Sequence, residues 1–382
     1  MRSREADMLT GLDETLLHQG PLLDAALVSD HRFYDRYVFT AVRPDGQIGI
    51  VTGMAVYKYL NVMEGYVATQ VAGARQRNMR LSRPLRPIAS GRELGPLRTE
   101  FTEPFKTLRF LCNRSERGDS FDLTFHAFLA PHLEAHHFGR VDGRVHTDYS
   151  RFSQVGWTSG AALVDGKAYE VDRWFSWRDH SWGLRPGVGG FEPFTGTRAG
   201  SGLPSSIRAG GRGILVIYLG FATDSYGGVF QLQEDENGGR LYLDGSIGTR
   251  AGTREIVDAE HEISFIPGTR LFDRTQLRLT ASDGVKWDID VEALGRAWVF
   301  KGLGYDGGFN DEKGMGVWRS DALTVETDTY DISHAEEVVM PDGRRLRPRH
   351  REQPVTVSLN GEVGQGHFPI IAIGPNKRYG LS

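Results

Sequence analysis

The sequence lacks several features that would point to particular classes of protein. Only one cysteine, Cys112, stands among 382 residues, so an intrachain disulfide and a cysteine-based metal site are both excluded. No stretch approaches the roughly 18 consecutive apolar residues of a membrane-spanning helix. Residues 1–19 carry charges and no apolar core, unlike a signal peptide. We therefore expect a protein of the reducing cytoplasm.

Neither sign of charge dominates the chain. There are 45 Lys and Arg residues against 49 Asp and Glu residues, and the formal net charge is −4. A nearly neutral chain has no electrostatic footprint for nucleic acid, so we expect no nucleic-acid partner.

Turn-forming residues are abundant instead. The chain holds 48 glycines, and Asp-Gly or Asn-Gly pairs recur along its whole length, as at Asp165-Gly166, Asp283-Gly284 and Asn360-Gly361. Such pairs tolerate positive φ and fit two-residue hairpin turns. Their flanks alternate between apolar and polar residues, as in the strand that would precede Asp283-Gly284. The pattern predicts an all-β protein of antiparallel strands.

The spacing of these signals predicts two tandem antiparallel β-barrels. Residues 187–212 are rich in Gly, Ser, Thr and Pro and form the best linker candidate. They separate an N-terminal barrel, residues 1–186, from a C-terminal barrel, residues 213–382. Closure into barrels removes exposed sheet edges. We expect only short helices, with candidates at residues 4–19 and 67–77.

The most informative stretch is residues 174–185, which hold three of the seven tryptophans. Within it, Arg178, Asp179 and His180 are consecutive. A carboxylate beside Arg and His can transfer protons, and large aromatic rings can exclude water from such a site. The alternative interpretation is a structural clasp between the two halves, since Trp is mostly buried and Arg–Asp pairs often fix turns.

A second candidate is the run from His132 to His137. On a strand, His132, Glu134 and His136 would share one face and offer two imidazoles and a carboxylate to a metal. Pro131 and Gly139 favour a short or broken element instead. We therefore favour a surface loop without a metal.

A third candidate is the glycine-rich segment 302–318. It lacks the spacing of a phosphate-binding loop and has no parallel-sheet context. A rim loop of a barrel fits better, with Tyr305 and Trp318 at the mouth of a pocket.

Three patches resemble the signature of a known superfamily. These are residues 152–156, residues 160–166 and the string Arg-Asp-His-Ser-Trp-Gly at 178–183. They are similar to the double-lipocalin-like, calycin-related superfamily, which includes carotenoid 1,2-hydratase-like and AttH-like proteins and, more distantly, tocopherol cyclase. Residues 304–318 also resemble its second-domain signature, although this chain has Asp306-Gly307 where His-Pro is common.

The resemblance implies two packed lipocalin-like barrels with an apolar cavity near their interface. It also implies hydration, cyclisation or ring closure of lipophilic terpenoid, steroid or aromatic molecules, without a cofactor. Fold analogy leaves the reaction to be argued from the site.

Our leading hypothesis is therefore a cofactor-independent lyase or isomerase. Asp179 would donate or accept the proton, because an apolar barrel favours the acid form of a carboxyl group. His180 would relay the proton, and Arg178 would orient the carboxylate or the substrate, although an Arg178–Asp179 pair would favour a base. The expected substrate-binding residues are Trp177, Trp182, Arg185, Tyr305 and Trp318. A non-catalytic carrier of the same ligands is the alternative, and a metal enzyme is a third possibility.

Overall fold

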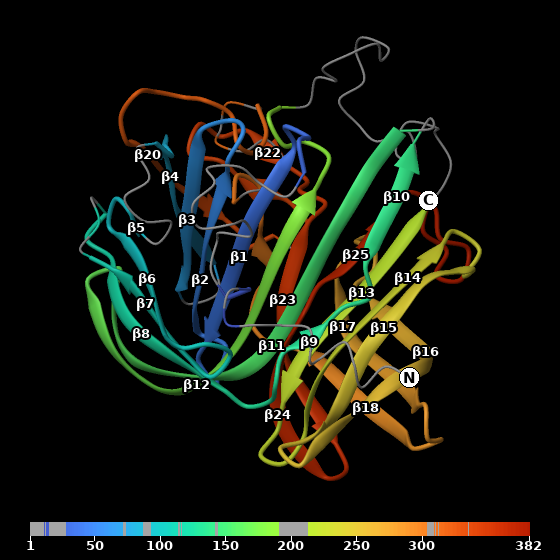
Figure 1. Ribbon diagram of the computed structural model, residues 1–382. Coiled ribbons are helices and arrows are strands. Elements are labelled where there is room, and N and C mark those ends of the chain that lie inside the picture. Colours follow the sequence, from blue (N-terminus) through green and yellow to red (C-terminus); the bar gives the residue numbers. More distant parts are fainter. Residues whose placement is uncertain are drawn as a thin grey trace.

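The computed structural model consists of two antiparallel β-sheets (Figure 1). It describes residues 28–71, 74–86, 93–113, 117–141, 144–190, 213–303, 313–334 and 336–382, with Gly11, Asp13, Glu14, Ser115, Phe309 and Asp311. In this part of the chain every regular element is a strand. The prediction of an all-β fold with two tandem barrels is confirmed.

The first sheet has 15 strands in the order β22-β21-β20-β4-β3-β2-β1-β12-β11-β8-β7-β6-β5, with β9 and β10 also paired to β11. Its strands are β1 (Phe33–Val42), β2 (Ile48–Tyr57), β3 (Val62–Val71), β4 (Arg75–Pro84), β5 (Glu93–Leu94), β6 (Leu97–Glu103), β7 (Thr107–Cys112), β8 (Ser120–Ala127), β9 (His132–Leu133), β10 (His137–Val141), β11 (Arg144–Val164), β12 (Lys167–Leu184), β20 (Thr324–Asp331), β21 (Val338–Val339) and β22 (Arg345–Leu346). The long strands β11 and β12 cross the middle of the molecule (Figure 1).

The second sheet closes into a barrel, because β13 pairs with β14 on one side and with β24 on the other. The closed ring runs β13-β14-β15-β16-β17-β18-β23-β24. Its sheet comprises β13 (Ile214–Ala222), β14 (Gly227–Asp235), β15 (Arg240–Thr249), β16 (Gly252–Phe265), β17 (Phe272–Ala281), β18 (Lys286–Ala293), β19 (Trp298–Val299), β23 (Arg351–Leu359), β24 (Glu362–Phe368) and β25 (Ile370–Ile373). Closure leaves the ring without an unpaired edge.

The hairpin signals are placed as predicted. Asp165 and Gly166 connect β11 to β12 with φ values of 51° and 76°, and Asn360 and Gly361 connect β23 to β24 with φ values of 51° and 80°. Positive φ at both central residues is the mark of the turn that matches strand twist.

The predicted helix at residues 67–77 is wrong, because residues 67–71 belong to β3 and residues 75–77 belong to β4. Val67 and Ala68 are both buried although they point to opposite faces, since this sheet is covered on both sides. A strand covered on both faces shows a continuous apolar run, which can be mistaken for a helix. Of the other helix candidate, residues 4–19, all but Gly11, Asp13 and Glu14 lie outside the described residues.

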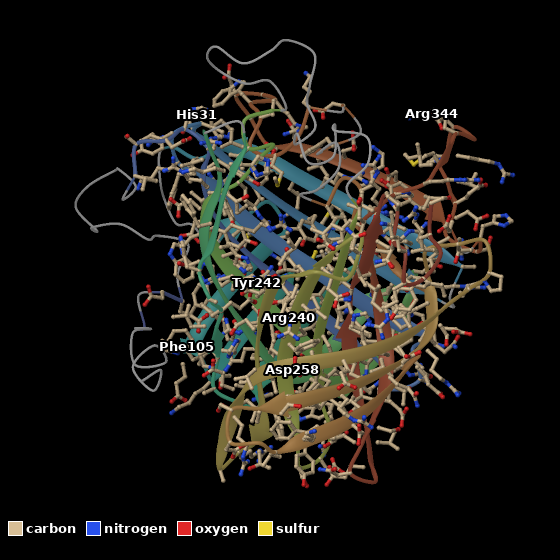
Figure 2. All side chains as sticks on the ribbon, turned by 90° about the vertical axis from the view of Figure 1, so that its right-hand side faces the viewer. His31, Phe105, Arg240, Tyr242, Asp258 and Arg344 are labelled. Carbon is tan, nitrogen blue, oxygen red and sulfur yellow. The ribbon has the colours of Figure 1, made fainter. Side chains whose placement is uncertain are left out.

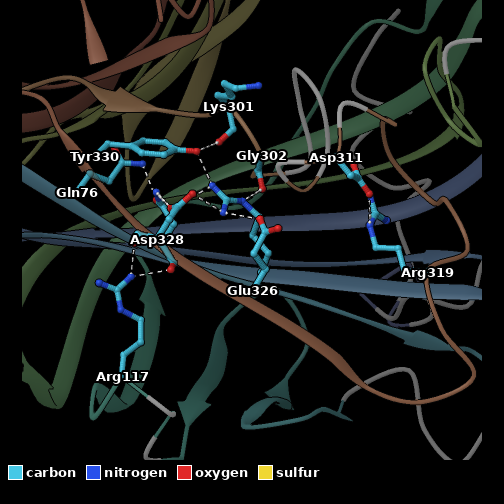
Figure 3. Close-up of polar contacts among 11 residues, drawn as sticks. Gln76, Arg117, Lys301, Gly302, Asp311, Arg319, Glu326, Asp328 and Tyr330 are labelled. Carbon is cyan, nitrogen blue, oxygen red and sulfur yellow. Dashed lines mark hydrogen bonds and ion pairs between the residues drawn. The ribbon is translucent and has the colours of Figure 1, made fainter. Parts of the chain in front are cut away.

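The C-terminal half also contributes to the first sheet. Strand β20 pairs with β4 along its whole length, from Thr324 opposite Ser82 to Asp331 opposite Arg75. The buried Arg80 fixes this pairing: its Nη1 donates to Asp328 at 2.9 Å and to Glu326 at 3.0 Å, and its Nε donates to the carbonyl of Gly302 at 2.7 Å (Figure 3). The two halves are therefore interlocked.

The first sheet has two buried faces with different surroundings. All ten residues of β1 are buried, as are all ten of β2. On the inner face, Phe39 and Met54 belong to a large apolar core. On the interface face, Val38 and Val51 pack with Trp298 of the second half. Because side chains alternate along a strand, consecutive residues enter different compartments.

Candidate functional site

The Arg178–Asp179–His180 triplet is divided by this alternation. All three residues lie on β12, opposite Phe39, Val38 and Tyr37 of β1 respectively. Arg178 and His180 share the inner face with Phe39 and Tyr37, and Asp179 points with Val38 to the interface face. The structure therefore does not bring Asp179 together with either of its neighbours.

Asp179 is a buried carboxyl group that the fold leaves unpaired. Its side chain is 7% exposed and has no hydrogen bond or ion pair among the residues that the structure describes. Burial raises the pKa of Asp179 above its usual value. The guanidinium groups of Arg151, Arg36 and Arg185 counteract this shift without cancelling it. Arg178 points to the other face of β12 and pairs with Glu14, so the base-favouring pair considered above does not form.

A fully paired network lies beside Asp179. Arg151 donates from Nε to both oxygens of Glu134 at 2.8 Å and from Nη2 to Gln231 at 2.7 Å. Tyr218 donates to Glu134 at 2.6 Å. Burial opposes the charge of Glu134, but Arg151 and the neighbouring His137 outweigh it and hold the pKa of Glu134 well below its usual range. Since Tyr218 and Gln231 come from the second barrel, this network is a clasp between the sheets.

A small polar cavity lies on the same interface face. It measures about 20 Å³ and is lined by Arg36, Tyr57, Glu64, Tyr66 and Arg80, together with Met54, Ala55, Gly65, Gly302 and Phe309. A cavity of this size holds one or two water molecules. The resemblance implied an apolar cavity near the interface, and the lining found here instead combines charged and hydroxylated side chains with apolar ones.

Glu64 is a second carboxyl group whose pKa is raised by burial. Burial raises the pKa of Glu64 to about 7, although Arg319 pairs with it and the amide of Gly316 donates to it at 2.9 Å. Arg319 also binds Asp311 at 2.9 Å (Figure 3) and lies 4.0 Å above the ring of Phe309. A group with a pKa near 7 is suited to general acid–base catalysis at neutral pH.

The predicted binding residues are distributed over the molecule. Arg185 lies near Asp179, with its guanidinium 4.9 Å from the ring centroid of Tyr149. Trp182 faces inward, 5.4 Å from the ring of His180. Trp318 is 45% exposed, and Tyr305 lies outside the described residues.

Trp177 packs between the two sheets. Its ring stacks on His367 at 5.3 Å and meets Tyr218 edge-on at 5.2 Å. The absent side chain of Gly220 makes room for it, because a Cβ there would lie 2.3 Å from Cδ1 of Trp177. Trp177 therefore joins the halves by packing.

The three candidate metal ligands do not converge. His132 binds Asp244 at 3.0 Å, His136 binds Asp148 at 2.7 Å, and Glu134 belongs to the clasp. No group of three potential ligands able to hold a metal occurs in the ranges that the structure describes.

Sequence reasoning missed Arg36, Glu64 and Arg151. A signal was present for the first two: each is a charged residue inside an otherwise largely apolar strand, β1 or β3. Charged residues are almost never fully buried unless they are paired or functional. Only the register of the strands shows that Arg36 and Glu64 share a face.

A model of the Family of unknown function (DUF8625) matches residues 9–382. The chain belongs to this family. No curated protein sequence matches this DUF8625 chain. Its fold is similar to the crystal structure of a "putative AttH" from Nitrosomonas europaea, with a TM-score of 0.50 and 12% identity over 92% of this chain and 96% of that one. The crystal structure of CghA matches with a TM-score of 0.45 and 10% identity, over 94% and 97%.

The first of these likenesses supports an AttH-like fold, as the resemblance implied, and carries no information about chemistry. Across the described ranges, no helix is long and apolar enough to cross a membrane.

Proposed function

We propose that this protein is a cofactor-independent lyase or isomerase that transfers a proton to or from a lipophilic small molecule bound between the two sheets. Asp179 is the proton donor or acceptor. A terpenoid, steroid or aromatic skeleton is the substrate class that the superfamily resemblance favours.

The observation that carries this proposal is the unpaired, buried carboxyl group of Asp179. A carboxyl group that is 7% exposed and has no protein partner among the described residues is unusual in a folded protein and calls for an explanation. Interdomain stability does not explain it, because Glu134 and Arg151 already provide the clasp. A carboxyl group whose pKa is raised by desolvation holds its proton more tightly than usual, which suits it to donate a proton to a substrate.

The guanidinium groups near Asp179 indicate which kind of substrate atom would lie beside them. Arg36 and Arg185 act electrostatically on Asp179. Arg36 also lines the polar cavity. A substrate oxygen that gains negative charge as the proton moves would be stabilised by these guanidinium groups. Glu64, on the same cavity, supplies a second group that can exchange a proton near neutral pH.

The size of the cavity restricts the entry of a substrate. The cavity of about 20 Å³ is far smaller than the roughly 300 Å³ or more that a drug-sized ligand fills. Substrate binding therefore requires the segment from Met315 to Arg319, which covers Glu64, to move away from the first sheet.

The test begins with native mass spectrometry of the whole protein against a panel of terpenoids, steroids and aromatic lactones, followed by turnover assays on every bound compound. Asp179→Asn should retain binding and lose turnover by about 100-fold or more, the usual contribution of a general acid or base. Asp172→Asn is the matched control, because Asp172 is an exposed residue of the same strand.

Equal turnover in Asp179→Asn and wild type would refute the assignment. Ligand binding without turnover by the wild type would indicate a carrier instead.

A further inference from the structure

We infer that the inner face of the first sheet holds a receptor for the carboxylate of a lipophilic acid, and that Glu14 occupies this receptor as an internal ligand. The site is separate from Asp179, because Arg178 and Asp179 point to opposite faces of β12.

Arg178 is the centre of the receptor. It is 1% exposed, and its guanidinium carbon lies 5.1 Å from the ring centroid of Phe152 and 5.5 Å from that of Phe125. Nη1 donates to Oε1 of Glu14 at 2.5 Å, and Nη2 donates to Oε2 at 3.1 Å. This is the two-pronged geometry by which arginine recognises carboxylates.

The backbone supplies a third donor. The amide of Phe105, in the turn between β6 and β7, donates to Oε2 of Glu14 at 2.5 Å. Phe105 has a φ of 62°, a left-handed conformation that is unusual for a bulky residue. That conformation turns the amide toward the carboxylate, and such strain concentrates at ligand-binding sites.

The receptor is held in place without Glu14. Gln154 accepts hydrogen bonds from Nε of Arg178 at 2.9 Å and from Nη2 at 2.6 Å. The amide nitrogen of Gln154 donates to the carbonyls of Phe105 and Leu129, at 2.7 Å each. Arg178, Gln154 and Phe105 all belong to the first sheet and its turns, so the donors keep their arrangement whichever carboxylate they bind.

Glu14 comes from outside both sheets, before β1 begins at Phe33. A free carboxylate could accept the same hydrogen bonds from Arg178 and Phe105, so the exchange would preserve every polar contact. A buried arginine without an anion is strongly unfavourable, which requires that one carboxylate or another occupy the site.

Aromatic rings define the class of acid. Phe105 stacks edge-on against Phe152 at 5.5 Å, and Phe152 meets Trp182 at 6.3 Å. Phe105 and Trp182 are only half-buried, and Phe105 lies at the rim of the molecule (Figure 2). The rings thus lead from Arg178 toward the surface, and they fit an apolar chain or ring system attached to the carboxylate.

The experiment measures binding of dodecanoate to the full chain, with its methyl ester as the uncharged comparison. A tethered carboxylate competes at a high effective concentration, so Glu14→Gln should bind dodecanoate at least ten-fold more tightly than wild type. Affinity for the ester should be unchanged. Glu103→Gln, at an exposed carboxylate beside the same turn, is the matched control and should behave as wild type.

Arg178→Met in the Glu14→Gln background should abolish the preference for dodecanoate over the ester. Because Glu14→Gln leaves Arg178 without an anion, the variant should unfold at a lower temperature, and dodecanoate should raise that temperature more than it does for wild type. If Glu14→Gln unfolds, its refolding with dodecanoate but not with the ester supports the receptor. Dodecanoate binding of equal strength in wild type, Glu14→Gln and the double variant would overturn it.

Discussion

Asp179 and His180 are neighbours in the sequence, yet their side chains lie on opposite faces of β12. His180 places Nε2 2.7 Å from Asp35 on the inner face, beside the Arg178 receptor. Asp179 faces the second barrel and has no such partner among the described residues. The triplet therefore serves two compartments, and the proton relay from Asp179 to His180 that the sequence suggested would have to cross the sheet.

The unfolding free energy of Asp179→Asn should equal or exceed that of wild type at pH 8. The pKa of Asp179 is raised on folding, so the folded state binds its proton more tightly than the unfolded state does. The stabilisation that protonated Asp179 contributes is present at low pH. It is lost as the pH rises through the pKa that Asp179 has in the folded protein. Urea unfolding at pH 5 and pH 8 checks this, and a variant that loses stability at pH 8 would show that Asp179 is a clasp after all.

Glu64 should give the protein a pH-dependent stability in the acidic range. Its pKa is 4.5 when unperturbed and about 7 in the fold, so the folded state binds more protons between these values. The unfolding free energy should fall as pH rises from 4.5 to about 7, by at most about 3 kcal/mol. Glu64→Gln should flatten this slope, whereas Glu170→Gln, at an exposed position of β12, should leave it intact. An unchanged slope in Glu64→Gln would contradict the assignment.

The two carboxylates bound to Arg80 should stabilise the protein to different degrees. Asp328 is 6% exposed and Glu326 is 32% exposed, and both accept from Nη1 of Arg80. Removing the charge of Asp328 should cost more unfolding free energy than removing that of Glu326, because water compensates less for a charge lost at a buried site. We expect Asp328→Asn to lose about 2–3 kcal/mol of unfolding free energy and Glu326→Gln about 1 kcal/mol or less. Chemical denaturation measures both, and the reverse order would argue against β20 as an interlocking strand.

Gly220→Ala should weaken the contact between the halves. The new Cβ would lie 2.3 Å from Cδ1 of Trp177, whose ring is held between Tyr218 and His367. Overpacking of this kind costs roughly 1–3 kcal/mol. The loss should shrink in a Trp177→Leu background, and Gly139→Ala, where the nearest atom is 3.9 Å away, should be close to neutral. Additive losses in the double variant would rule out the steric explanation.

Local sequence signals predicted much of the fold. Hairpin turns at Asp165-Gly166 and Asn360-Gly361 depend on residues that tolerate positive φ, and that property belongs to the residues themselves. The sequence of residues 67–71 predicts a helix although they form a strand, because a strand buried on both faces does not alternate.

The sequence by itself determined the β architecture, the hairpins and the importance of the stretch around Asp179. Tertiary structure alone decided which compartment each residue enters. Arg36, Glu64 and Asp179 share one face only because β1, β3 and β12 belong to one sheet, and Glu14 reaches Arg178 across 164 positions of the chain. Local chemistry fixes turns and alternation, whereas the pairing of distant strands and the packing of one sheet on another depend on the free energy of the whole fold.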